Sequence, residues 1–148
     1  MASSILISFN DSVSSRAALD FFTRLAFCKD DTHITLLHIF RKPTASEELM
    51  GKRFTQEQPM RLKAVLEKAR DQLVENGFSP ENIEIELVTE SYATTSEGII
   101  DQCKKKRYDM VVIGRKRMSK AEEFVHGDIS MKLIRVLEGA AILVVKSN

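Results

Sequence analysis

The sequence contains no tryptophan, only two cysteines and only three prolines in 148 residues. Cys28 and Cys103 lie far apart, and neither belongs to a C-x-x-C pair or to a cluster of metal-ligand residues. The patterns that indicate a zinc site or a dithiol redox centre are therefore missing, and buried reduced thiols are the expected state. No apolar run approaches the roughly 20 residues of a membrane-spanning helix, and no basic segment precedes an apolar one at the start. We expect cytoplasmic residence and no membrane partner.

The charges of the chain nearly cancel. Its 22 Lys and Arg residues against 21 Asp and Glu residues give a formal net charge of +1. Such a chain has no overall attraction to nucleic acid or to an acidic membrane, so a charged partner would need a local patch. Hydrophobic residues at 43% and charged residues at 29% are ordinary for a globular protein. The length fits one domain, and we expect residues 1–148 to form it.

Short apolar segments alternate with amphipathic ones along the chain. Residues 62–73 have the i, i+3, i+4, i+7 and i+11 apolar spacing of one helix face. In residues 83–87, apolar side chains alternate with Glu84 and Glu86, which indicates a strand with one wet face at a sheet edge. Nearly continuous apolar strands separated by helices indicate a mostly parallel sheet covered on both faces. The sequence predicts a single-domain, doubly wound α/β fold with helices on both faces of a five-stranded, mostly parallel sheet, whose strands are segments 5–9, 33–40, 83–87, 109–114 and 140–145.

Residues 41–59 interrupt this alternation. The segment is polar and contains Pro43, Gly51 and Pro59, which favour turns over regular structure. We expect a long irregular excursion here, which is a lid, an interaction surface or a disordered loop.

Two loops are candidates for a ligand site. In open α/β sheets, ligands bind beyond the carboxyl ends of the strands where the strand order reverses, commonly beside the first strand. This rule selects residues 10–12 after the first strand and residues 114–130 after the fourth. In the second loop, Gly127 and Asp128 precede a helix whose free backbone N–H groups suit an anion. Glycines at a strand end and a helix start also serve turns and caps, so the spacing alone does not identify a ligand.

At these loops the sequence resembles the universal stress protein family, and the likeness extends over residues 5–145. Nucleotide-binding members of that family have the pattern G-x-x-G, nine residues, then G-(Ser/Thr) after the fourth strand. Gly114 and Gly127 fill the first and last glycine positions of this pattern. Arg117 stands at the second glycine position, and Asp128 stands where the family has a hydroxyl group. The resemblance therefore implies a nucleotide site with two altered positions.

These departures weaken the implied nucleotide site. A carboxylate at Asp128 would repel a phosphate by roughly 1 kcal/mol at about 4 Å in bulk water, and by more in a pocket. The same carboxylate stabilises a helix start by roughly 0.3 to 1 kcal/mol, so it can replace the phosphate there. Arg117 either blocks close backbone approach or contacts an anion itself. After the first strand the resemblance implies an adenine-contacting Asp, where this chain has Asn10 with a different hydrogen-bond pattern.

The resemblance implies a stress-response regulatory or interaction module, not an enzyme, with a degenerate nucleotide pocket. The alternative is a nucleotide sensor that binds ATP or AMP with Mg; no cofactor is firmly implied. An ATP hydrolase or related adenine-nucleotide enzyme is a weaker alternative, because no nucleophile–base pair or metal-ligand cluster can be assembled around His33, His38 and His126. The candidate nucleotide pocket consists of Asn10, Ile39, Gly114, Arg115, Arg117, Gly127, Asp128, Ile129 and Ser130.

The resemblance also implies a homodimer through the last strand. Residues 141–145 are uniformly apolar and would be hazardous as a bare sheet edge. Arg115, Lys116, Arg117 and Lys120 form a local basic patch that suits phosphate, an acidic protein or nucleic acid, although such a run is usually a solvated loop. Because no aromatic residues are interleaved with these cations, we do not expect nucleic acid.

Overall fold

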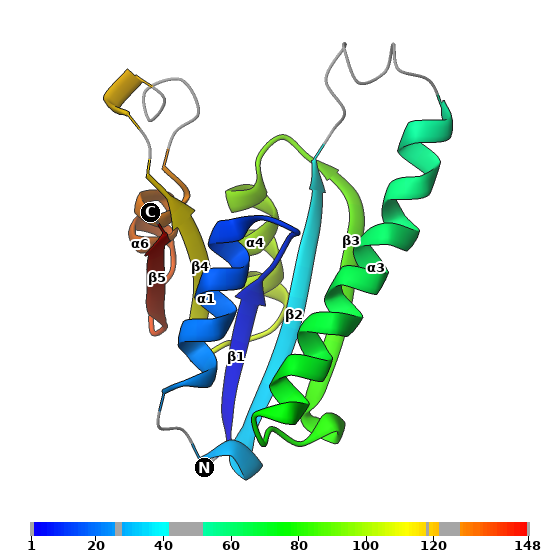
Figure 1. The fold of residues 1–148 in the computed structure, drawn as a ribbon. Helices are drawn as coiled ribbons and strands as arrows, with labels where there is room; N and C mark the ends of the chain where they lie inside the picture. Colours follow the sequence, from blue (N-terminus) through cyan, green and yellow to red (C-terminus); the bar gives the residue numbers. More distant parts are fainter. Residues whose placement is uncertain (1, 26–27, 42–51, 118, 122–127, 148) are drawn as a thin grey trace.

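The computed structural model describes residues 2–25, 28–41, 52–117, 119–121 and 128–147, apart from the side chains of residues 41, 52–59 and 91. Its strands form one five-stranded sheet in the order β3-β2-β1-β4-β5, and every neighbouring pair is parallel (Figure 1). The strands are β1 (Ser3–Ser8), β2 (Thr32–Arg41), β3 (Ile83–Tyr92), β4 (Met110–Lys116) and β5 (Ala141–Ser147).

The strand order confirms the predicted α/β fold. β1 lies between β2 and β4, so the strand order reverses at β1 and a topological switch point lies at its carboxyl end. β3 lies at one edge, as the alternation with Glu84 and Glu86 predicted, and β5 lies at the other. The two candidate loops thus follow the neighbouring strands β1 and β4, beyond the carboxyl ends of the sheet.

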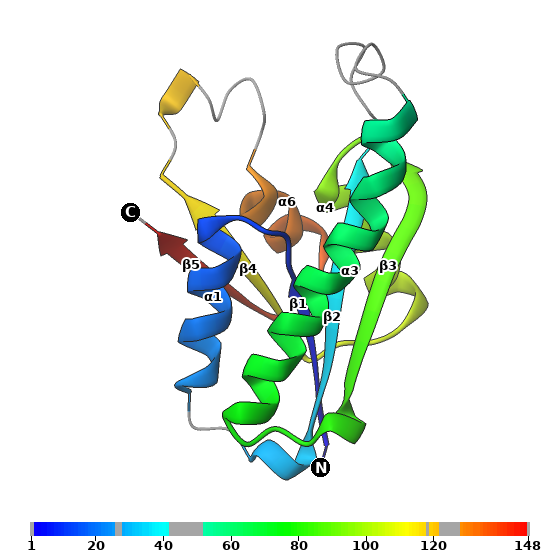
Figure 2. The same cartoon turned by 45° about the vertical axis from the view of Figure 1, so that its right-hand side comes forward.

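Helices cover both faces of the sheet, as Figures 1 and 2 show from two directions. The short 3-10 helices η1 (Lys29–Asp31) and η2 (Pro80–Asn82) precede β2 and β3. One face packs against α1 (Val13–Thr23) and α3 (Lys52–Glu75), and the other against α4 (Thr95–Lys105) and α6 (Ile129–Val136).

Each face of the sheet has its own core because successive strand residues point to opposite sides. In β1, Ile5 and Ile7 join the core beneath α1 and α3, while Leu6 between them joins the core beneath α4 and α6. All three side chains are at most 2% exposed. Burial on both sides explains why this strand is apolar without interruption.

The expected irregular excursion over 41–59 is wrong for its second half. Helix α3 begins at Lys52 and continues through Pro59, whereas residues 42–51 lie outside the described residues. Residues 52–58 contain neither glycine nor proline. Once the apolar stripe of residues 62–73 has packed as a helix, each residue added to its amino-terminal end gains one backbone hydrogen bond. These bonds offset the one that is lost because Pro59 has no N–H group.

The expectation of buried thiols is also wrong in part. Cys28 is exposed and Cys103 is half-buried, and both are free. Burial raises the pKa of the Cys103 thiol, which favours its protonated form. Within the described part of the chain, none of the helices is both long enough and apolar enough to cross a membrane.

Candidate functional site

The carboxyl end of β1 leads into a loop that is closed by its own side chains. Asn10 Oδ1 accepts hydrogen bonds from the Ser12 N–H at 2.9 Å and from Ser15 Oγ at 2.9 Å. Ser15 Oγ in turn accepts the Asn10 N–H at 3.2 Å, and Ser12 Oγ caps α1 by accepting the Ser15 N–H at 3.1 Å. The amide oxygen expected to contact a base therefore has two partners within the loop.

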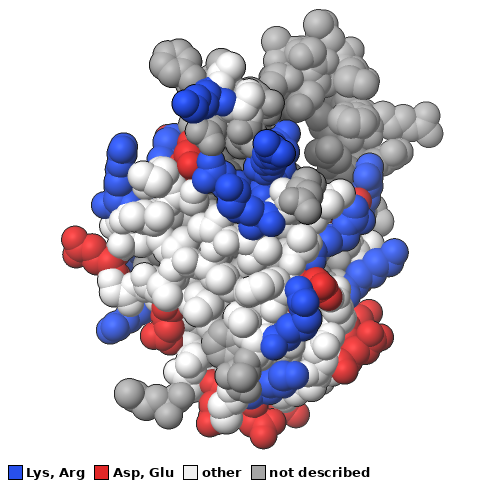
Figure 3. Space-filling model, turned by 60° about the vertical axis from the view of Figure 1, so that its left-hand side comes forward, with Lys and Arg blue, Asp and Glu red and all other residues white. Residues whose placement is uncertain are grey.

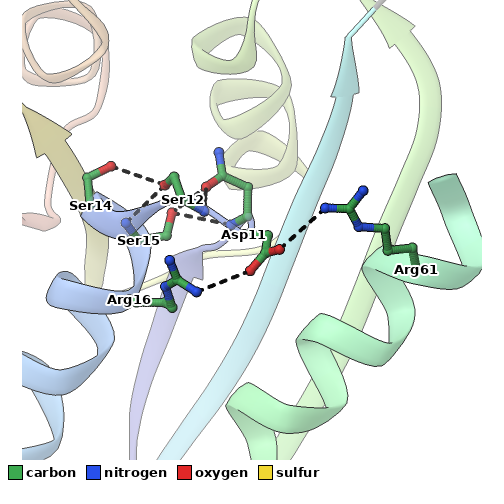
Figure 4. A network of polar contacts seen from close by, with 7 residues as sticks. Asp11, Ser12, Ser14, Ser15, Arg16 and Arg61 are labelled. Carbon is green, nitrogen blue, oxygen red and sulfur yellow. Dashed lines mark hydrogen bonds and ion pairs between the residues drawn. The ribbon is translucent and has the colours of Figure 1, made fainter.

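Asp11 links this loop to a distant helix. Its carboxylate forms ion pairs with Arg16 of α1 and Arg61 of α3, each at 3.6 Å, and Figure 4 shows it lying between the two guanidinium groups. All three side chains are more than a third exposed, so solvent screens the pairs and each adds about 1 kcal/mol or less. No local pattern in the sequence indicated Arg61, because only the fold brings α3 to this loop.

Gly114 at the end of β4 is required by packing. A Cβ atom on this residue would lie 2.1 Å from the carbonyl oxygen of Ser14 and 2.8 Å from the backbone nitrogen of Ser15. Real Cβ atoms do not approach backbone atoms so closely, so any side chain would displace the first turn of α1. The first glycine of the family pattern thus has a sufficient structural role without a ligand.

Asp128 occupies the amino terminus of α6. Its Oδ1 accepts the Ser130 N–H at 3.1 Å and the Ser130 hydroxyl at 2.6 Å, while its Oδ2 lies 3.1 Å from the Arg115 guanidinium. The side chains of Asp128 and Arg115 are only 20% and 25% exposed. A carboxylate therefore holds the helix N–H group, the hydroxyl and the guanidinium that would suit a phosphate.

These partners also govern the charge of Asp128. Partial burial alone would raise the pKa of this carboxyl. The Ser130 hydroxyl, the Arg115 charge and the N–H groups of Met131 and Ser130 favour the ionised form more strongly, and the pKa of Asp128 is lowered below its usual value. Asp128 is therefore anionic at neutral pH.

The remaining predicted pocket residues are dispersed. Ile39 is 4% exposed and belongs to the core beneath α4. It packs so closely against Gly98 that a Cβ atom added to this glycine would lie 2.6 Å from the Ile39 side chain. Ile129 is 40% exposed on α6, and Arg117 is exposed after β4. Gly127 lies outside the described residues. The structure brings Arg115, Asp128 and Ser130 together, and it places Ile39 in the core.

Two depressions formed by described residues lie elsewhere. One, of about 240 Å³, is lined by His33, Glu84 and Lys106 among others near the amino ends of β1 and β2. The other, of about 210 Å³, lies between the carboxyl-terminal ends of α4 and α6 and includes Cys103. In the described part of the chain, no group of three or more His, Cys, Asp or Glu residues is placed to hold a metal ion.

Sequence reasoning also missed a polar cluster that joins β3 to α4. The Tyr92 hydroxyl donates to Asp101 and, at 3.0 Å, to Glu90, and Lys105 lies 3.4 Å from Asp101. The hydrogen bond to Asp101 raises the pKa of Tyr92 and lowers the pKa of Asp101. These contacts tie the end of β3 to α4.

Comparison with known proteins gives a consistent result. The model of the universal stress protein family matches residues 1–146. Solved structures with similar folds include a universal stress protein in complex with cAMP, with a TM-score of 0.70 and 14% identity over 99% of this chain and 98% of that one. A universal stress protein family protein from Arabidopsis thaliana with AMP bound has a TM-score of 0.67 and 16% identity over 99% and 92%. The hypothetical protein MJ0577 has a TM-score of 0.72 and 19% identity over 100% and 98%. No curated protein sequence matches.

Proposed function

The chain belongs to the universal stress protein family, and we propose that it is a non-enzymatic regulatory or interaction module of the stress response whose nucleotide pocket is degenerate. We place this role in the cytoplasm, as the sequence predicted. Among the described residues, no group of three or more His, Cys, Asp or Glu side chains is placed to hold a metal ion, which supports a binding role over metal-dependent catalysis.

The main support for a degenerate pocket is the ion pair between Asp128 and Arg115 at 3.1 Å. An incoming phosphate would have to compete with an anion that is part of the chain, always present and already hydrogen-bonded by Ser130. It would also lie close to the Asp128 carboxylate and be repelled by it. Both effects lower nucleotide affinity.

The runner-up is a nucleotide sensor that binds ATP or AMP, with or without Mg. Solved family members hold cAMP and AMP, and their folds resemble this one. Arg115 and Ser130 lie together at the start of α6, where both could contact phosphate if Asp128 moved aside. This arrangement is the observation that favours the alternative.

The test of the pocket is a titration with Mg-ATP and with AMP, followed by thermal unfolding, together with analysis of acid-released material from the purified protein. A ligand at about 100 times its dissociation constant would add about 2.7 kcal/mol of stability. We expect no shift in the melting temperature and no copurified nucleotide. A saturable shift, or stoichiometric nucleotide in the preparation, would establish the sensor and reject the degenerate pocket.

We also propose a homodimer through β5. The two edges of the sheet differ: β3 has exposed Glu84 and Glu86, which oppose pairing with another strand, whereas β5 has only apolar residues from Ala141 to Val145. Leu143 and Val145 are only partly buried against the core. Sedimentation equilibrium at micromolar protein should give the dimer mass; a monomer at all concentrations up to tens of micromolar would reject it.

A further inference from the structure

The depression of about 210 Å³ between α4 and α6 lies at the end of the sheet opposite the candidate nucleotide site. It is lined by the last turns of both helices, by Tyr108 shortly before β4 and by Ala140 directly before β5. We call it the α4–α6 groove. None of the described residues of β5 lines it, so the groove is separate from the broad surface with few charges that Figure 3 shows on the side of β5.

The α4–α6 groove exposes apolar side chains that the core leaves partly uncovered. Ile100, Cys103 and Leu137 are partly buried against the core beneath α4 and α6, and all three line the groove. Val136 at the end of α6 lines it as well and is 50% exposed. An apolar group of a ligand that contacts these side chains is removed from water together with them, which favours binding.

Charged side chains of opposite sign approach this apolar lining from its two sides. Lys104 and Arg107 line the groove from the last turn of α4 and the residues after it, and Glu138 lines it from beyond the end of α6. Within the described part of the chain, no group of opposite charge lies within 4.0 Å of any of the three. All three charges are therefore available to a ligand.

Two neighbouring cations have other partners. Lys105 Nζ lies 3.4 Å from the Asp101 carboxylate, and Lys106 Nζ lies 5.4 Å from the centre of the Tyr108 ring. Neither lysine lines the α4–α6 groove. The four consecutive cations of residues 104–107 thus divide into two that line the groove and two that are engaged elsewhere.

We propose that the α4–α6 groove binds a free α-amino acid with an apolar side chain. The carboxylate of the ligand pairs with Lys104 and Arg107, its ammonium group pairs with Glu138, and its side chain covers Ile100 and Val136. The carboxyl end of α6, directly before Glu138, adds partial negative charge that favours the ammonium group. An anion without an ammonium group would be repelled by Glu138, and an amine without a carboxylate would be repelled by Lys104 and Arg107.

The probes are L-leucine and analogues that each lack one of its groups, and isothermal titration calorimetry measures their binding to the full chain. We expect saturable binding of leucine with a dissociation constant below about 1 mM. Isocaproate lacks the ammonium group, isoamylamine lacks the carboxylate and glycine lacks the apolar side chain, so each should bind at least about tenfold more weakly. No saturation by leucine up to about 10 mM, or equally tight binding of any analogue, would reject the proposal.

Variants of the charged residues test which groups hold the ligand. Lys104→Gln combined with Arg107→Gln should weaken leucine binding by at least about tenfold. Glu138→Gln should weaken the binding of leucine but strengthen that of isocaproate, because it removes the repulsion of a carboxylate. The matched control, Lys105→Gln combined with Lys106→Gln, removes the same charge from the same segment and should bind leucine as the wild type does. Thermal unfolding establishes that each variant is folded, and equal weakening by the control would reject the proposal.

Cys103 reports whether leucine binds in the α4–α6 groove, because it belongs to the lining. In the variant Cys28→Ser it is the only thiol of the chain, and mass spectrometry follows its alkylation by iodoacetamide. Leucine at about ten times its dissociation constant should slow this alkylation by about tenfold, whereas glycine should not. Leucine binding that leaves the rate unchanged would place the ligand elsewhere and reject the groove. None of these results depends on whether the nucleotide pocket at the other end of the sheet is empty.

Discussion

Replacing Asp128 by serine tests directly whether this carboxylate closes the nucleotide pocket. The change restores the hydroxyl of the family pattern and removes one negative charge. At about 4 Å, unit charges repel by roughly 1 kcal/mol in bulk water and by roughly 4 kcal/mol at the effective dielectric of a protein surface. Since each 1.4 kcal/mol or so is about tenfold, Asp128→Ser should bind Mg-ATP between about fivefold and several hundredfold more tightly than the wild type.

The variant is expected to fold. Serine and aspartate are comparable N-cap residues, so the start of α6 keeps its cap. The ion pair between Asp128 and Arg115 is mostly shielded from solvent, so its loss leaves the Arg115 charge partly uncompensated and should lower the free energy of unfolding by about 1.5 to 3 kcal/mol. Isothermal titration calorimetry measures the affinity, and thermal unfolding measures the stability of the same preparation.

Two further variants separate charge from other effects. Asp128→Asn removes the charge and keeps the size of the side chain, so it should recover most of the gain in affinity. Asp71→Ser removes an exposed carboxylate from α3 and should leave nucleotide binding unchanged. If neither Asp128 variant binds nucleotide more tightly than the wild type, the electrostatic explanation is wrong; tight binding by the wild type would refute it as well.

Three other measurements test the site and its supports. Gly114→Ala should lower the free energy of unfolding by about 1 to 3 kcal/mol, because the new Cβ would meet the backbone of α1. Urea denaturation measures this loss. Gly139→Ala is the control: it has open space around the new Cβ but a φ of +73°, and it should lose less stability. Ser12→Ala should cost about 1 kcal/mol through loss of the α1 cap, whereas Ser3→Ala at the start of β1 should cost less. The pKa of Asp128 is lower in the folded chain than its value of about 3.9 in the unfolded chain. The ionised carboxylate therefore stabilises the folded chain fully above that unfolded-state pKa, and this stabilisation is lost as the pH falls through the folded-state pKa. The difference in free energy of unfolding between wild type and Asp128→Asn should thus be constant from about pH 7 to 5 and shrink below about pH 4; a difference that grows on acidification would contradict this.

Much of the fold could be predicted because its signals are local. Uninterrupted apolar residues in β1 indicated a strand buried on both faces, and Glu84 and Glu86 indicated an edge strand, since side chains alternate between the two faces of a sheet. The start of α3 was missed, because proline and glycine nearby suggested a loop while the helix was stabilised by packing further along.

The candidate site shows the same division between local and distant information. That Asp128 caps α6 could be expected from its own position, because a cap depends on the next few residues. That the same carboxylate neutralises Arg115 was decided by the tertiary structure, as were the link from Asp11 to Arg61 and the approach of α1 to Gly114. The sequence by itself determined most of the strands, helices and caps, although not the start of α3, because neighbouring residues define most of those energies. Only the folded chain decided which charges and backbone atoms meet, because these contacts join residues that are distant along the sequence.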